Sequence, residues 1–445
     1  MNEQNTTVPT PESPGPKAPM VSDTTEKVRK SLGKRYAREK RFRRFGIIAI
    51  VASLSFLAVL IISITARGLP AFKQTFINLD VTLDANTLGV AENPDEDTLR
   101  RANYNGAIKN SLQELFPDVK KRKDKKALYK FVSNGGQYDL QAKVMADPAL
   151  IGQTINVWLP VGDDASGYLR GHIDTTVPEK KRRFKDNQIT WIEELKSDDR
   201  IQTKFNRTFF SRGDSREPEL AGIKGSLFGS ILTLLVTLTL SFPIAVATAI
   251  YLEEFAPKNR WTDIIEVNIN NLAAVPSIVF GLLGLAIFIN FFHLPRSAPI
   301  VGGLVLSLMT LPTIIISARA ALKSVPPSIR DAALGLGASK LQVVFHHVLP
   351  LAMPGILTGT IIGMAQALGE TAPLLMIGMV AFIVDVPTTL TDPATVLPVQ
   401  IFQWADLPEK GFVEKTSAAI MVLLGVLIAM NAIAVLLRRR FERKW

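Results

Sequence analysis

Long apolar runs alternate with polar segments along most of this chain. Six runs approach or exceed the ~20 residues that a helix needs to cross the ~30 Å hydrocarbon layer of a membrane. They cover residues 46–66, 226–251, 270–292, 299–318, 354–378 and 417–437. The pattern predicts a mainly α, polytopic membrane protein with six transmembrane helices, which places both termini on the same side of the membrane.

The distribution of basic residues predicts which side that is. Residues 27–44 carry ten Lys or Arg against one Glu, and the end of the chain, RRRFERKW, adds five more against one Glu. Because Lys and Arg stay in the cytoplasm when apolar segments insert, we expect both termini to be cytoplasmic. A net charge of +11 also suits nucleic-acid binding, but a basic block next to a span favours topology and anionic lipid instead.

The runs divide the chain into segments with different expected structures. The tail 1–25 is rich in Pro, Ser and Thr, which predicts disorder. The remaining segments are a basic cytoplasmic segment 26–45, a first transmembrane helix 46–66, an extracytoplasmic domain 67–222, and a transmembrane domain 223–445 with a cytoplasmic loop 326–350. Residues 67–222 are here named the inserted domain.

The inserted domain is predicted to have an α+β fold. The runs INLDVTLDA, TINVWLPV and YDLQAKVM are typical of strands, whereas EDTLRRANYNGAIKNSLQELF and ITWIEELKSDDRIQTKF are typical of helices. The basic clusters at 120–126 and 179–186 suit either an anion site or solvated surface loops.

Trp404, which lies between the last two predicted spans, is expected in the aromatic belt at the membrane interface.

The chain lacks the motifs of catalytic and metal sites. It has no Cys and four His, and the adjacent His346 and His347 do not have the i, i+4 spacing that directs two His at one metal. The stretch GLGASK at 335–340 lacks the spacing and the preceding strand of a phosphate-binding loop. We therefore expect no catalytic residue, no metal site, no cofactor on this chain and no ATPase activity of its own.

Loop 326–350 is an amphipathic stretch between two apolar runs. Two prolines at 326 and 327 favour a helix start, and a short helix is expected over 328–335. Gly335 and Gly337 permit a sharp turn before a second helix with one apolar face, which Pro350 is expected to stop. Two short helices of this kind form either a knob that packs into a partner protein or a loop that lies on the bilayer.

A family resemblance of this loop favours the first alternative, a knob that packs into a partner protein. DAALGLGASKLQVVFHHVLP resembles the EAA signature of bacterial ABC-importer permeases, with Asp in place of the commoner Glu. In that family the loop is the coupling helix that docks on the ATPase subunit. The resemblance implies that the contact is formed by Asp331, Ala332, Ala333, Gly337, Phe345, Leu349 and Pro350.

Two further segments narrow the family. QALGETAPLLMIG at 366–378 and the C-terminal stretch from LPVQIFQWADLP onward are similar to the phosphate-importer permease of the PstA type, over residues 222–445. The resemblance implies the type I importer permease fold and a subunit that translocates inorganic phosphate. The implied partners are a PstC-like second permease, a PstB-like ATPase dimer that binds ATP and Mg, and a PstS-like phosphate-binding protein. Another oxyanion (sulfate, molybdate or phosphonate) and a membrane-anchored sensor remain as alternatives.

Glu370 is the candidate pathway residue. It lies 16 residues after Pro354, or ~24 Å along a helix, well inside the bilayer. An ionisable group at that depth costs ~2.5 kcal/mol or more unless it faces protein or water. It is either a pathway group or a carboxyl that locks helices together. We expect Glu370 to pair with either Arg319 or a cation of a partner subunit, with Thr371 donating to the transported anion. Arg319 is alternatively a simple charge that fixes topology.

Overall fold

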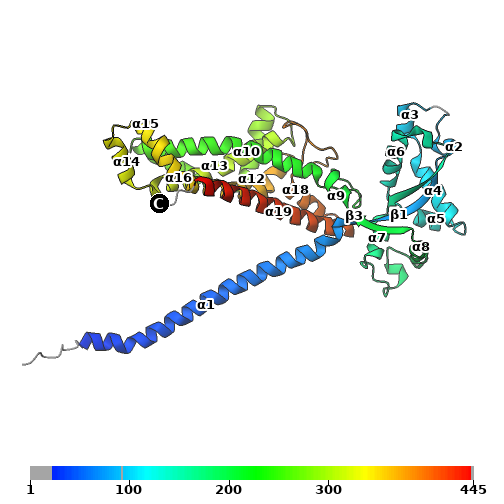
Figure 1. Ribbon diagram of the computed structural model, residues 1–445, viewed down its shortest axis with the longest axis horizontal. Helices are drawn as coiled ribbons and strands as arrows, with labels where there is room; N and C mark the ends of the chain where they lie inside the picture. The colour runs from blue at the N-terminus through cyan, green and yellow to red at the C-terminus, as the bar shows by residue number, and fades with distance from the viewer. Residues whose placement is uncertain (1–22, 92–93, 442–445) are drawn as a thin grey trace, which may run out of the picture. The chain divides into compact units, whose positions relative to one another are not determined.

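The structure is a computed structural model that describes residues 23–91 and 94–441 (Figure 1). The chain divides into two units, residues 1–63 and 64–445. Most of helix α1 (Asp23–Gly68) belongs to the first unit, so the basic segment and the first apolar run form one continuous helix. Its apolar side chains, such as Leu54 and Phe56, are exposed, as lipid contact requires. Of the expected disordered tail, residues 1–22 lie outside the described residues, and residues 23–25 are helical instead.

The inserted domain is built on a three-stranded antiparallel sheet. Strand β1 (Lys73–Thr82) lies between β2 (Thr154–Pro160) and β3 (Ile201–Phe205). Its alternate residues Ile77, Leu79 and Val81 are buried, which is the period of two that a sheet with one covered face requires. Two of the three predicted strand runs therefore fall on strands, and the predicted α+β fold is confirmed.

Short helices complete the core of the inserted domain. These are α2 (Ala85–Leu88), α3 (Glu96–Arg101), α4 (Tyr104–Leu115), α5 (Arg122–Tyr129), α6 (Gly136–Ala146), α7 (Asp163–Leu169), α8 (Asp186–Ser197) and α9 (Arg207–Ser211), with 3-10 turns η1 (Leu69–Phe72), η2 (Pro148–Leu150) and η3 (Glu179–Lys181).

The prediction of a strand for YDLQAKVM was wrong, because this run lies in α6. The buried residues of α6 include Gly136, Leu140 and Val144. They recur every four positions, which is a helical period.

The second half of the chain consists mainly of long apolar helices. They are α10 (Lys224–Ile250), α11 (Arg260–Ala273), α12 (Ser277–Gly284), α13 (Pro299–Ser324), α14 (Pro327–Gly335), α15 (Lys340–Gln342), α16 (Leu349–Gly369), α17 (Ala372–Met376), α18 (Leu397–Ala405) and α19 (Lys410–Phe441), with π-helical segments η4 (Tyr251–Phe255), η5 (Leu285–Phe291) and η6 (Val343–Val348). Five helices in the described residues are long and apolar enough to cross a membrane, and a bent pair makes a sixth span if it is counted as one.

That bent pair corrects the third predicted span. Residues 270–292 do not form one helix: α11 ends at Ala273, and the α12–η5 segment that follows is inclined to it by 100°. Pro276 accounts for the break, because it lacks a backbone donor and disfavours the helical conformation at Val275.

The fifth span begins earlier and ends earlier than predicted. Helical structure is continuous from Lys340 through η6 and α16 to Gly369, so Pro350 does not stop the helix as expected. The π-helical segment η6 directly precedes it and widens the helix where the proline ring would otherwise meet a backbone carbonyl. Gly369 is the last helical residue, and Glu370 after it has an extended backbone.

Glycines allow the central helices to approach closely. A Cβ at Gly355 of α16 would lie 2.6 Å from Ala321 Cβ of α13, and one at Gly359 would collide with Ser317. Contacts of this kind are typical of membrane helices, where small residues permit backbone approach. They hold α16 against α13, the helix that leads into loop 326–350.

Candidate functional site

Loop 326–350 has local sequence signals for each of its turns. Pro327 occupies the first turn of α14, and the helix ends before Gly337, whose φ of 86° lies in the left-handed region that glycine tolerates. Ser339 then caps the next helix, since its hydroxyl accepts from the Gln342 amide at 3.3 Å while the Gln342 side chain accepts from the Ser339 amide at 2.9 Å. The loop is therefore two helical segments joined by a tight turn, as predicted.

The loop has a buried side and an exposed side. Val343, Val344 and Val348 are buried together with residues of α13 and α16. The exposed side carries large apolar side chains, which are Leu334, Leu336, Leu341 and Phe345. Leu336, at the tip, is 90% exposed. An apolar cluster of this kind on a structured knob is typical of a surface that a partner covers.

The residues predicted to form the ATPase contact divide between these two sides. Asp331, Ala332, Gly337 and Phe345 are exposed. Ala333 is instead 6% exposed and belongs to the core of the loop, and Leu349 and Pro350 lie half-buried at the start of α16. The structure thus brings part of the predicted set to one accessible face.

Arg330 fixes the loop to the end of α10. Its guanidinium donates to the Glu254 carboxylate, with Nη2 2.7 Å from Oε1 and Nε 3.3 Å from Oε2. It also donates to the carbonyl oxygens of Val325 at 2.7 Å and Leu322 at 2.9 Å. Glu254 was missed at the sequence level, although an acidic pair at 253–254 directly after a long apolar run was a usable signal. This arrangement ties α14 to both α10 and α13.

Arg319 has different partners from the one expected. Its guanidinium pairs with Glu266 of α11 and lies 3.6 Å from Glu253 Oε2, and Lys323 Nζ lies 3.6 Å from the same oxygen. The expectation that Arg319 pairs with Glu370 is therefore wrong, and a cation of a partner subunit as the partner of Glu370 stays a prediction. Two acidic residues that follow α10 on the chain satisfy Arg319 instead.

Glu370 lies at a break between two helices. It is the residue after α16, with extended backbone, and Thr371 precedes α17. Its side chain is half-buried, and none of the ion pairs between described residues includes it. A Cβ at Gly281 would lie 2.7 Å from Pro373 Cα, so α17 packs directly against α12. A helix break inside a membrane domain is tolerated where the chain lines a cavity or packs inside protein.

Comparisons with known proteins place this geometry in a family. Residues 241–445 match the model of the binding-protein-dependent transport system inner membrane component, and residues 29–179 match a domain of unknown function, DUF3333. The phosphate transport system permease protein PstA 1 of Mycobacterium tuberculosis (strain CDC 1551 / Oshkosh) is 30% identical over 228 residues, which are 51% of this chain and 74% of that protein. The chain belongs to the PstA family of permeases.

Other relatives of this PstA family member differ in how much they share with it. The PstA protein of Yersinia pestis is 30% identical over 48% of this chain and 71% of its own length. The probable ABC transporter permease protein YqgI of Bacillus subtilis (strain 168) is 36% identical over 155 residues, and the chain spans about half, 52%, of its length. Among solved structures, a chain of the MetNI methionine ABC transporter covers 50% of this chain at 17% identity with a TM-score of 0.40.

In this PstA family member a second polar cluster joins the inserted domain to α18 and α19. Glu414 of α19, with a side chain 9% exposed, pairs with Arg170 of the inserted domain, and its Oε1 lies 2.9 Å from His172 Nδ1. Trp404 Nε1 donates to Asp214 at 2.8 Å, and Gln400 donates to the Gly222 carbonyl at 3.0 Å. We name these contacts the junction.

The expected position of Trp404 in an interfacial belt was wrong. Trp404 is 1% exposed, so it is a core residue and does not lie in an interfacial belt. Burial raises the pKa of Asp214, and the hydrogen bond from Trp404 opposes that rise. Sequence patterns could not reveal this cluster, because the residues that pair in it are 178, 190 and 244 positions apart.

Proposed function

We propose that this chain is the permease subunit of an ATP-driven importer that moves inorganic phosphate across the inner membrane. The observation that carries the proposal is that a chain of the PstA family presents an exposed apolar knob rigidly tied to its membrane helices. The chain supplies the pathway and the coupling surface, and partner subunits supply ATP hydrolysis.

We further propose which side of the membrane each segment faces and which proteins the chain binds. Loop 326–350 and both termini face the cytoplasm, and the inserted domain faces the periplasm. Loop 326–350 docks on an ATPase dimer that binds ATP and Mg, a second permease subunit completes the pathway, and a periplasmic binding protein delivers phosphate. The basic stretch of α1 and the exposed apolar residues beside it support contact with lipid.

Coupling follows from how the loop is held. A partner groove that receives Leu336 and Phe345 moves the loop as the ATPase dimer closes. Because Arg330 contacts Glu254 and the carbonyls of Leu322, in the last turn of α13, and Val325, directly after it, the movement reaches α10 and α13 together. Asp331, next to Arg330 but exposed, is then available to the partner.

The decisive test of substrate is uptake by the reconstituted transporter. The chain would be placed in vesicles with its partner permease, ATPase and binding protein, and radiolabelled phosphate, sulfate and molybdate would be compared with and without ATP. ATP-dependent accumulation of phosphate alone supports the proposal. Uptake of another oxyanion in its place reassigns the substrate, and assembly without any uptake favours a sensor.

We assign Glu370 and Thr371 to the pathway, and Arg319 to the ion-pair cluster at the inner end of the helices. The half-buried carboxyl at a helix break supports this role. Glu370→Gln should lower phosphate uptake about tenfold, or ~1.4 kcal/mol in barrier, while the complex assembles normally. Asp406→Asn, at an exposed carboxyl, is the control. Equal loss of assembly and uptake would make Glu370 a helix-locking residue.

A further inference from the structure

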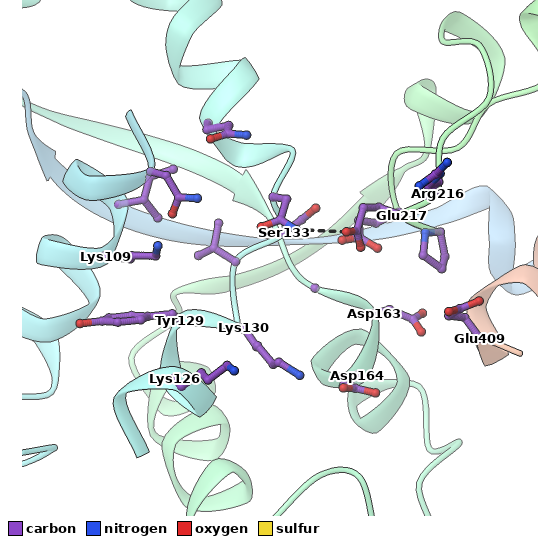
Figure 2. Close-up of a pocket in the computed structure, with 18 of the residues that line it drawn as sticks. Lys109, Lys126, Tyr129, Lys130, Ser133, Asp163, Asp164, Arg216, Glu217 and Glu409 are labelled. Carbon is purple, nitrogen blue, oxygen red and sulfur yellow. Dashed lines mark hydrogen bonds between the residues drawn. The ribbon is translucent and has the colours of Figure 1, made fainter. Parts of the chain in front are cut away.

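The inserted domain contains a cavity of about 550 Å³ that transport through the membrane helices does not use. One wall comes from α4 and α5 and carries Lys109, Lys126 and Lys130. The other wall carries Asp163 and Asp164 of α7, with Glu217 and Glu409 beside them. Figure 2 shows the lysines and the carboxylates on opposite sides of the space. Arg183 and Arg216 also line the cavity, and Arg216 lies beside Glu217. The three lysines therefore face the carboxylates across the space, and the acidic side carries one cation of its own.

The two walls do not neutralise each other. Among the ion pairs between described residues, none joins a lysine of the first wall to a carboxylate of the second. Each wall is held by its own contacts: Lys109 Nζ lies 5.7 Å from the centre of the Tyr129 ring, and Glu217 accepts from Asn134 Nδ2 at 3.0 Å. Opposite charges held apart across a cavity favour a ligand that carries both signs.

A buried carboxyl on the acidic side points to the same chemistry. Glu219 also lines the cavity, and its Oε2 is buried without a hydrogen-bond partner among the described residues. Burial raises the pKa of Glu219 to about 7, while a hydrogen bond with Ser133 opposes that rise. A buried polar atom without a partner is costly unless a ligand or water satisfies it. The ammonium group of a ligand would supply the donor that this oxygen lacks.

We propose that this cavity binds a small zwitterion that carries a phosphoryl group at one end and a primary amine at the other. Three lysines match a doubly charged phosphoryl group better than a single carboxylate, and the acidic wall receives the amine. The volume lies in the range of ordinary ligand pockets, which is ~300–1,000 Å³. Ethanolamine phosphate is the simplest member of this class.

The position of the cavity gives the ligand a regulatory role that goes beyond translocation. Lys126 and Lys130 belong to the inserted domain, whereas Glu219 lies five residues before α10 and Glu409 directly precedes α19. A ligand that contacts both walls ties the inserted domain to the first residues of two membrane helices. Occupancy would therefore stabilise one arrangement of these helices.

The test measures binding directly, without transport. Isothermal titration calorimetry on the full-length chain in detergent would compare ethanolamine phosphate, inorganic phosphate and ethanolamine. We expect ethanolamine phosphate to bind at least about tenfold more tightly than either half. Lys126→Gln with Lys130→Gln, and separately Glu217→Gln, should weaken it about tenfold or more. Lys143→Gln, at an exposed lysine away from the cavity, should bind like the wild type.

Each outcome decides the proposal. Absence of heat with ethanolamine phosphate, or equal binding of inorganic phosphate, overturns it. Because the substituted lysines are exposed, unchanged thermal midpoints will confirm that the variants fold.

Nanodiscs distinguish two sources of the same ligand chemistry, a lipid headgroup and a soluble ester. If phosphatidylethanolamine lowers the affinity for ethanolamine phosphate and phosphatidylcholine does not, the natural ligand is a lipid headgroup; if neither lipid does, it is a soluble ester. Either result leaves the proposed transport function untouched.

Discussion

Loop 326–350 and the junction both hold charged groups in place, but they do so with different parts of the chain. Most of the contacts that shape the loop come from residues within it or from the adjoining ends of α13 and α16, and Glu254 contributes from farther away in the sequence. The junction joins Arg170, Asp214 and Glu414, which are distant in sequence. A motif can therefore reveal the loop, whereas the junction exists only once the inserted domain has folded onto α18 and α19.

The two regions also differ in what remains unsatisfied. At the loop, Arg330 has partners for its nitrogens, while apolar Leu336 is left exposed. At the junction the apolar groups are buried, and neighbouring Glu219 has a carboxyl oxygen with no hydrogen-bond partner among the described residues. An exposed apolar surface calls for a protein partner, and an unpaired buried acid calls for a polar ligand or a proton. This difference underlies the two proposals, that the loop docks on a protein and that the cavity beside the junction binds a ligand.

Reversing the charge at the loop should produce the largest effect. Arg330→Glu places two carboxylates together in a half-buried site, which costs about 4 kcal/mol and detaches α14 from α10. Phosphate uptake should fall by more than about a hundredfold. The double variant Arg330→Glu with Glu254→Arg should recover part of the uptake. An unaffected single variant would show that this ion pair does not position the loop.

Glu219, which lies next to the junction, should make the free energy of unfolding depend on pH. Its pKa is raised from 4.5 to about 7, so the folded chain keeps a proton that the unfolded chain has released between these values. Stability should therefore fall as pH rises through this window, by up to about 3 kcal/mol. Glu219→Gln should remove that part of the pH dependence and raise the thermal midpoint above pH 7. Parallel curves for the two proteins would contradict the assignment.

Removing the Arg170 charge should weaken the junction by a smaller amount. Arg170→Met leaves the buried Glu414 with His172 as its remaining partner and should cost about 2 kcal/mol. The matched control is Arg100→Met, because the Arg100–Glu96 pair is more than half exposed on both sides and is worth less than ~1 kcal/mol. Thermal unfolding followed by circular dichroism compares them. Equal shifts would mean that the junction pair is no stronger than a surface pair.

Substitution at the tip of the loop should give the smallest effect. Gly337→Val forces a β-branched residue into the left-handed region, at a cost of about 1–2 kcal/mol. ATP hydrolysis should continue while uptake falls about tenfold. Gly335→Ala, at a helical position with open space around it, is the control and should couple normally. Normal coupling in Gly337→Val would remove the turn from the mechanism.

Local patterns predicted local structure well. Strands β1 and β2 followed from alternating apolar residues, and the turn at Gly337 followed from glycine. Errors arose where distant contacts decide the outcome. Pro350 continues a helix because η6 relieves its clash, and Arg319 pairs with Glu266 because α11 bends back toward α13. Neither event has a signal within a short stretch of sequence.

The uninterrupted helical stretch from Lys340 to Gly369 gives the chain a mechanical consequence. It is 30 residues long, or about 45 Å at ~1.5 Å per residue. One end lies in the docking knob, and the other ends at the break beside Glu370. Such a rod acts as a lever arm: a tilt of about 5° about the knob end displaces the far end by about 4 Å over that length. A small rotation imposed by the proposed ATPase partner would thereby be converted into a displacement larger than a phosphate oxygen.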